Sequence, residues 1–111
     1  MKIAFAVNGE NLKAEIAPHF GRAKNFLIYD TETKSFEIYS NPEILGKELP
    51  PDFLNRLGVD AVLTFSLGPM AFEKLKKFGI KTYKAKKGTI SENIEFLEKT
   101  KLSPLSKEDI F

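Results

Sequence analysis

The sequence predicts an α/β fold, a three-layer α/β/α sandwich around a mixed five-stranded sheet with strand order 3-2-1-4-5 and strand 2 antiparallel. Two observations support this prediction. Apolar runs separated by polar turns fill the first half of the chain, whereas apolar runs alternate with helical patterns in the second half. Strands that alternate with helices pair in parallel through right-handed crossovers, so the later strands should extend the sheet on the far side of the first one.

Three strands are expected in the first half, separated by a long loop over residues 10–24 and a polar turn over 31–34: residues 2–7, 25–30 and 35–40. The first is an almost continuous apolar run, as in a central strand buried on both faces. In the third strand, residues expected to face the core alternate with residues expected to face solvent. Phe36 and Ile38 should face inward, while Glu37 and Tyr39 face outward.

Helices and strands then alternate. Helices are expected to begin at Pro50-Pro51, Gly68-Pro69 and Thr89-Ile90, and strands to span residues 59–65 and 80–85. Proline suits the first turn of a helix, and Gly58 and Gly79 should end the first two helices. Thr89 and Glu92 match a capping box, in which each side chain bonds the other's backbone. The apolar helix sides are expected to be Leu49, Phe53, Leu54 and Leu57, then Phe72, Leu75 and Phe78, then Ile90, Ile94 and Leu97.

With 111 residues, the chain is expected to form one domain over residues 1–100, followed by a tail over residues 101–111. The tail holds four apolar residues that would dock on the body or on a partner: Leu102, Leu105, Ile110 and Phe111. A frayed or self-docked tail is favoured over one that binds a partner.

Composition excludes several classes of protein. The absence of cysteine excludes disulfides, thiolate metal sites and a thiol nucleophile. A net charge of +2 does not indicate nucleic-acid binding. No apolar run approaches the roughly 20 residues of a membrane span, and the start of the chain has no signal-peptide pattern, so a cytoplasmic protein is expected. Glutamine is absent while Lys and Glu are plentiful, which indicates a heat-adapted source.

A binding site is expected where the sheet changes direction, beyond the carboxyl ends of its parallel strands. The loops there hold His19, the only histidine, and Arg22, one of two arginines. Two of the loops lead into helices at Gly68 and Gly88, whose backbone N–H groups and dipole favour an anion. The predicted binding residues are Asn8, His19, Gly21, Arg22, Ser66, Gly68, Gly88 and Thr89.

Structural roles remain alternatives at this point. His19 would then donate to a nearby carbonyl, and Arg22 would pair with a carboxylate such as that of Asp30. Phe20 would anchor the loop in the core, and Met70, in the first turn of a helix, is more often a core residue than a ligand. Seven lysines cluster in one third of the chain. Such a cluster is more often a solvated helix face and strand ends than a positive field that attracts an anionic ligand: Lys74, Lys76, Lys77, Lys81, Lys84, Lys86 and Lys87.

The motifs argue against an enzyme. The chain has neither a nucleophile elbow nor a phosphate-binding Gly-x-x-x-x-Gly-Lys loop. The inferred strand order is that of ribonuclease H-like folds, some of which are two-metal nucleases, but such chemistry needs several carboxylates close together. Residues 2–7, which would carry the leading carboxylate, contain no acid. No catalytic residue is therefore predicted.

Several segments together resemble the dinitrogenase iron–molybdenum cofactor biosynthesis family, the NifX-like group that includes the carboxyl-terminal domain of NifB. They are Ile16-Ala17-Pro18-His19-Phe20-Gly21-Arg22-Ala23 with Phe26-Leu27-Ile28-Tyr29-Asp30, Gly58-Val59-Asp60-Ala61-Val62 with Gly68-Pro69-Met70-Ala71-Phe72, and Gly79-Ile80-Lys81-Thr82-Tyr83 with Gly88-Thr89-Ile90. The resemblance covers residues 1 to about 98. It implies a ribonuclease H-like fold and a carrier of an iron–sulfur or iron–molybdenum cluster precursor, with His19 as the candidate metal ligand.

The chain departs from the family pattern in two places. Between the third strand and the first helix, members often have a glycine-rich stretch, whereas residues 41–48 contain one glycine and no soft ligand. After the second core strand, members usually place a glycine behind the threonine, whereas Thr64 is followed by Phe65. We expect this phenylalanine to narrow the crevice that a cluster would occupy.

The leading functional hypothesis is a non-enzymatic NifX-like carrier of an anionic cluster or its precursor, with possible protein partners in cofactor assembly. His19 would be the metal ligand and Arg22 the anion partner, with backbone donors at Gly68 and Gly88. Two alternatives stay open: an interaction adaptor that binds no cluster and works through its tail and lysine-rich edge, and a domain that binds a small anion without a metal. The oligomeric state is left open.

Overall fold

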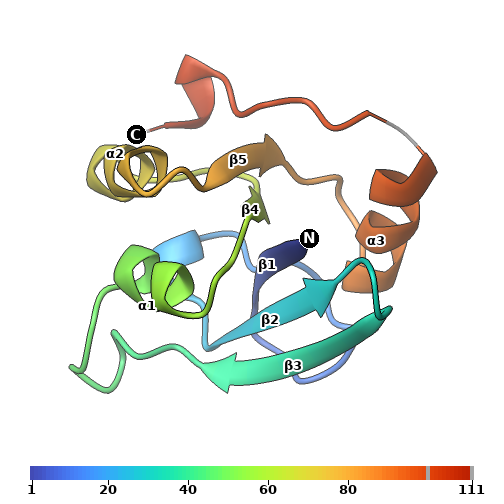
Figure 1. Cartoon of the computed structure of the whole chain (residues 1–111), viewed down its shortest axis with the longest axis horizontal. Helices are drawn as coiled ribbons and strands as arrows, with labels where there is room; N and C mark the ends of the chain where they lie inside the picture. The colour runs from blue at the N-terminus through green and yellow to red at the C-terminus, as the bar shows by residue number, and fades with distance from the viewer. Residues whose placement is uncertain (100, 111) are drawn as a thin grey trace.

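The computed structural model describes residues 1–99 and 101–110, which form a mixed five-stranded sheet in the order β3-β2-β1-β4-β5 (Figure 1). The elements are β1 (Lys2–Val7), β2 (Asn25–Asp30), β3 (Ser35–Ser40), α1 (Pro50–Arg56), β4 (Ala61–Thr64), α2 (Pro69–Lys77), β5 (Lys81–Lys84) and α3 (Ile90–Lys99). β2 is antiparallel to both β1 and β3, whereas β1, β4 and β5 are parallel. The predicted strand order and the antiparallel second strand are confirmed; the wider likeness to ribonuclease H-like folds stays a prediction.

Helices cover both faces of the sheet, with α1 and α2 on one face and α3 on the other (Figure 1). The central strand β1 shows why two cores form. Ala4 and Ala6 pack toward α1 and α2, whereas Ile3, Phe5 and Val7 pack toward α3, because successive side chains of a strand point to opposite faces. The expectation of a first strand buried on both faces is therefore confirmed.

The orientation predicted for β3 is wrong at two positions, Tyr39 and Phe36. Ile38 does pack inward, on the α3 face, but Tyr39 also packs inward and meets the ring of Phe53 in α1 edge-on, with ring centroids 5.6 Å apart. Phe36, which was expected inside, is 38% exposed. Because helices lie on both faces of this sheet, side chains on either side of the edge strand can pack against a helix. The alternation of apolar and polar residues in the strand therefore does not show which residues are buried.

The helix boundaries follow the predicted signals. Gly58 and Gly79 end α1 and α2 with positive φ angles of 74° and 78°, a conformation that glycine adopts at little cost. Leu49 is the exception to the predicted apolar sides. It caps α1 in an extended conformation and is 45% exposed, because it precedes the first helical turn instead of lying on the buried side of the helix.

The segment after α3 docks on the body. Residues 103–105 run beside β5, where the backbone N–H of Lys84 donates to the carbonyl of Ser103 over 2.8 Å and that of Leu105 to Thr82 over 3.3 Å. Leu105 is buried in the core beneath α2. The chain thus crosses the β5 edge from α3 toward α2 (Figure 1). Phe111 lies outside the described residues, so its predicted docking stays a prediction.

None of the described helices is both long enough and apolar enough to traverse a lipid bilayer.

Candidate functional site

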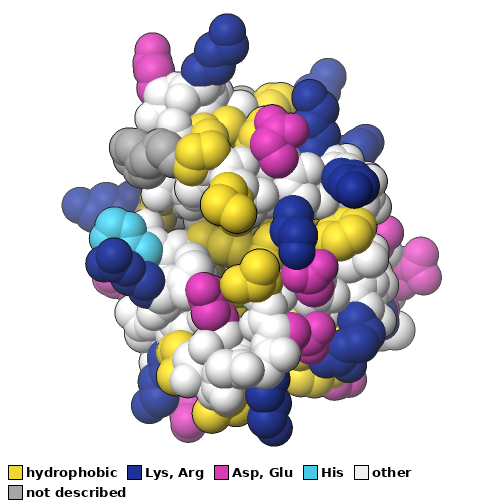
Figure 2. All heavy atoms as spheres, turned by 90° about the vertical axis from the view of Figure 1, so that its left-hand side faces the viewer, with side chains coloured by type: hydrophobic (Ala, Val, Ile, Leu, Met, Phe, Trp, Pro, Cys, Tyr) yellow, Lys and Arg dark blue, Asp and Glu magenta, His cyan; other side chains and the backbone are white. Residues whose placement is uncertain are grey.

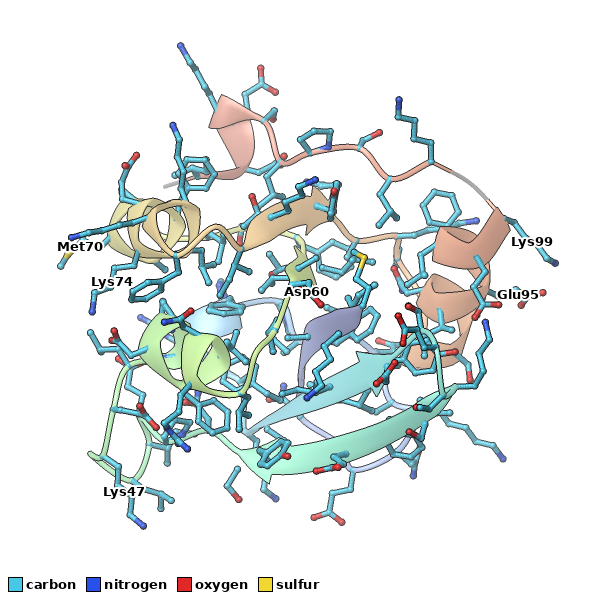
Figure 3. All side chains as sticks on the ribbon, in the orientation of Figure 1. Lys47, Asp60, Met70, Lys74, Glu95 and Lys99 are labelled. Carbon is cyan, nitrogen blue, oxygen red and sulfur yellow. The ribbon has the colours of Figure 1, made fainter. Side chains whose placement is uncertain are left out.

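A hollow of about 760 Å³ opens on the face that carries α1 and α2. We call it the His19 hollow. Three segments line it: residues 19–22, the approach to α1 with Glu43 and residues 49–51, and residues 66–71 with Glu73 and Lys74. Figure 2 shows this face, where apolar side chains surround the hollow and charged side chains stand on its rim. In Figure 3 Met70 and Lys74 lie at the same end of the molecule as Lys47 on the loop before α1.

The loop after β1 folds back to place His19 on the rim. Ile16 forms a bridge with Val7, and the backbone N–H of Ala17 donates to the carbonyl of Ala6 over 2.8 Å. Phe20 then begins a short 3₁₀ turn, η1 (Phe20–Arg22), and buries its ring against Phe26, with ring centroids 5.2 Å apart. The predicted anchoring role of Phe20 is confirmed.

The structural alternatives for His19 and Arg22 find no support among the described residues. Both side chains are exposed, and neither forms a hydrogen bond or an ion pair with a described residue. The carboxylate of Asp30 instead accepts the backbone N–H of Glu32 over 2.9 Å, and this bond is the main cause of its lowered pKa. The proposed Arg22–Asp30 pair was therefore wrong, because Asp30 is used by the turn that follows it.

The start of α2 forms the opposite wall. Gly68 is its N-cap and supplies no side-chain acceptor, and Pro69 has no N–H to donate. Within the described part of the chain, no side chain caps the N–H groups of Met70 and Ala71, which lie at the positive end of the helix dipole. Ser66 is half-buried in the same wall. His19, Gly21, Arg22, Ser66 and Gly68 are therefore brought together, as the sequence predicted.

The other three predicted residues lie elsewhere. Asn8 uses its side-chain carbonyl to accept the backbone N–H of Lys24 over 3.0 Å. Gly88 and Thr89 precede α3, on the opposite face of the sheet. None of the three lines the His19 hollow. The prediction that all strand-end loops share one site was wrong, because the loops divide between two faces.

At the start of α3, in contrast, the first backbone N–H groups already donate to acceptors of described residues. The N–H groups of Ile90 and Ser91 donate to the carbonyls of Ala14 and Leu12, each over 2.9 Å. The predicted capping box is present, with the N–H of Glu92 bonded to Thr89 Oγ1 over 3.1 Å. In return the N–H of Thr89 donates to the Glu92 carboxylate and lowers its pKa. The expected anion site at Gly88 and Thr89 is thus already filled by the protein itself.

Phe65 does not narrow the hollow, contrary to the prediction. Its side chain packs on the α3 face with Leu63 and Tyr83 among its neighbours in that core, and it does not line the His19 hollow. The alternation along β4 explains this position, since Leu63 and Phe65 belong to the core on the α3 face whereas Val62 belongs to the core on the other face. The departure from the family pattern at this position therefore leaves the hollow open.

The charges around the hollow are mixed. Lys74 Nζ lies 2.7 Å from a carboxylate oxygen of Asp52, which neutralises it. Arg22 has no such partner among the described residues, and the carboxylates of Glu43 and Glu73 also line the hollow. No three His, Cys, Asp or Glu side chains group as a metal site within the described part of the chain. The arrangement offers one imidazole, one guanidinium and the thioether of Met70, which is 80% exposed.

Sequence reasoning missed several lining residues. Glu43, Leu49 and Glu73 join the hollow only because their elements pack side by side. It also missed the buried side chain of Asn41, which bonds to the η1 turn. An asparagine before a proline is ordinary turn chemistry, so no local signal distinguishes this one.

Comparisons with known proteins identify a family. The family model described as "Dinitrogenase iron-molybdenum cofactor" matches residues 1–100. An uncharacterised protein of Methanocaldococcus jannaschii is 34% identical over 106 residues, which cover 88% of this chain and 86% of that protein.

Two solved structures have a similar fold. The apo form of the orange protein from Desulfovibrio gigas superposes with a TM-score of 0.84 at 24% identity, over 95% of this chain and 92% of that one, which shows a shared fold. A candidate NifB protein from Thermotoga, of the DUF35 family, gives a TM-score of 0.80 at 28% identity, over 96% of this chain and 97% of that one.

Proposed function

The chain belongs to the dinitrogenase iron–molybdenum cofactor family, and on this basis we propose that it is a NifX-like carrier of an anionic iron–sulfur or iron–molybdenum cluster or its precursor. The role is binding rather than catalysis, and the cluster is cargo that passes to other proteins of cofactor assembly. The proposal places the cargo in the His19 hollow.

One observation carries the proposal: the exposed imidazole of His19 and the guanidinium of Arg22 border a large hollow beside the start of α2, and no described side chain pairs with Arg22 or caps that helix. Imidazole is a good ligand for iron and neighbouring metals, and a guanidinium and helix N–H groups suit the negative charge of a cluster. Apolar side chains also line the hollow and would shield part of the cargo from water.

The same site argues for weak, exchangeable binding. With one histidine and no cysteine in the chain, a cluster gains at most one strong protein ligand, and the thioether of Met70 could add only a soft, weaker one. The carboxylates of Glu43 and Glu73 oppose an anion in the same hollow. A carrier that must release its cargo needs such limited affinity.

The test is anaerobic loading with ferrous iron, sulfide and molybdate, followed by desalting and measurement of bound metal and visible absorbance. The wild type should retain metal and absorb in the visible range, and His19→Ala should retain at least fivefold less. Lys99→Ala, an exposed change on α3, is the control and should load like the wild type. Equal loading of His19→Ala and wild type would exclude His19 as the ligand.

A second candidate function is binding of a small anion without a metal, which is favoured by the start of α2 and by Arg22, neither of which has a side-chain partner among residues 1–99 and 101–110. Titration calorimetry with inorganic phosphate separates the two functions. A metal-free anion site should lose affinity in Arg22→Gln and keep it in His19→Ala. The adaptor alternative is less favoured, since the tail that it would use packs against β5.

A further inference from the structure

The buried side chain of Asn41 joins two walls of the His19 hollow. Asn41 directly follows β3 and is 1% exposed. Its Nδ2 donates to the carbonyl of Ala23 over 2.8 Å and to that of Gly21 over 3.3 Å. Its Oδ1 accepts the backbone N–H of Glu43 over 3.0 Å, two residues further along the segment that follows β3, and Glu43 also lines the hollow. One carboxamide therefore bonds to both segments at once.

The η1 turn depends on such outside contacts because its own hydrogen bonds are long. The N–H of Arg22 reaches the carbonyl of His19 over 3.3 Å, and the N–H of Ala23 reaches that of Phe20 over 3.5 Å. His19 provides no side-chain cap. Phe20 holds the turn from below by packing, but the two carbonyls on either side of Arg22 are held by Asn41.

We infer that Asn41 is a positioning residue of the candidate site, one that sets the orientation of His19 and Arg22 toward the cargo. The inference rests on the proposed carrier function for its role in binding, whereas the clamp itself is a property of the protein alone. Without the carboxamide, the carbonyls of Gly21 and Ala23 turn to water, and the two functional side chains sample a wider range of orientations. The cargo then loses the preformed geometry that a single metal ligand requires.

The chain offers a matched control in Asn93, which is 0% exposed. Asn93 Nδ2 donates to the carbonyls of Lys86 and Thr89 over 2.8 and 2.9 Å, and its Oδ1 accepts the N–H of Lys86 over 2.8 Å. The chemistry matches that of Asn41: one buried carboxamide, two carbonyls and one backbone N–H. It differs in place, since Asn93 lies in α3 and holds the loop on the opposite face.

The experiment compares Asn41→Asp with Asn93→Asp. Each change keeps the shape of the side chain and replaces an NH₂ donor with an oxygen that faces two carbonyls. The probes are the anaerobic mixture of ferrous iron, sulfide and molybdate, and the NMR signals of the His19 ring and of the Gly21, Arg22 and Ala23 amides. We expect Asn41→Asp to lower retained metal at least fivefold and to shift these signals. Asn93→Asp should match the wild type within twofold and leave the signals in place.

The outcomes separate this inference from the proposed function. If the wild type takes up no metal, the carrier function fails, while shifted signals in Asn41→Asp alone still support the clamp. Unshifted His19 and Arg22 signals in Asn41→Asp overturn the inference, as does equal loss of metal in both variants. Should Asn41→Asp fail to fold, Asn41→Ser, which keeps a shorter donor, is judged by the same criteria.

Discussion

The backbone N–H of Leu67, in the wall of the His19 hollow, donates to the carbonyl of Asp109 over 3.0 Å. Leu67 and Ile110 also form an isolated parallel β-bridge. The segment after α3 thus ends against the turn that leads into α2. Since the family match covers residues 1–100, a segment outside the matched region contacts the site.

Asp109 should make the docking of this segment dependent on pH. Its carboxylate pairs with Lys84 and accepts the N–H of Ser106, and these contacts lower its pKa. A lowered folded-state pKa means that the carboxylate stabilises docking above its unfolded pKa of about 3.9. This stabilisation is lost as the pH falls through the folded-state pKa. We expect hydrogen-exchange protection factors of the Leu67 and Lys84 amides to fall below pH 4.

The variant Asp109→Asn checks the cause of this effect. It removes the charge, so it should lower both protection factors already at pH 7 and abolish their fall at low pH. Equal protection in the variant and the wild type at pH 7 would show that the backbone bonds alone hold the segment.

Gly68 allows a test of the anion-binding end of α2. It has an ordinary φ of −70°, and no atom lies within 4 Å of the position where a Cβ would be added. Both Gly68→Asp and Gly68→Asn should fit and stabilise α2 by a few tenths of a kcal/mol through a new cap. Only aspartate adds a negative charge beside the free N–H groups.

We therefore expect Gly68→Asp to weaken binding of phosphate or of the cluster by about three- to tenfold, on the order of 1 kcal/mol, whereas Gly68→Asn stays closer to the wild type. Calorimetry and metal loading measure the two cases. A similar loss in both variants would indicate that the cap, and not its charge, blocks the site.

Thr89→Ala should separate stability from binding. The change removes the capping box of α3 and should cost about 1 kcal/mol of unfolding free energy in urea denaturation. Retained metal should stay unchanged, because Thr89 lies on the face opposite the His19 hollow. If the variant retained less metal but kept its free energy of unfolding, Thr89 would have to contribute to metal binding.

Phe65→Ala addresses the position where the chain departs from its family. The side chain is half-buried against the α3 core, so its removal should cost about 2 kcal/mol, less than for a fully buried ring. Metal retention should not rise, since Phe65 does not line the hollow. A clear gain in retained metal would mean that Phe65 restricts the site after all.

The sequence alone predicted the elements and their order, because the signals that specify them are local. The apolar run of β1, the glycines that end α1 and α2, and the Thr89–Glu92 capping box each involve residues only a few positions apart. Parallel and antiparallel pairing then followed from the alternation of these elements. Five of the predicted binding residues line the hollow, because the loops that hold them follow predicted strands: His19, Gly21, Arg22, Ser66 and Gly68.

Only the tertiary structure decided which face each loop occupies. The side chain of Asn41 donates to carbonyls 18 and 20 positions earlier in the chain. The backbone N–H of Ile90 donates to the carbonyl of Ala14, which is also far away in the sequence. Such bonds depend on how the loops fold over the sheet, and nothing in the neighbouring sequence specifies them. At the start of α3 the loop after β1 supplies the carbonyls of Ala14 and Leu12 to the first N–H groups, whereas no described loop carbonyl accepts the N–H groups of Met70 and Ala71 at the start of α2.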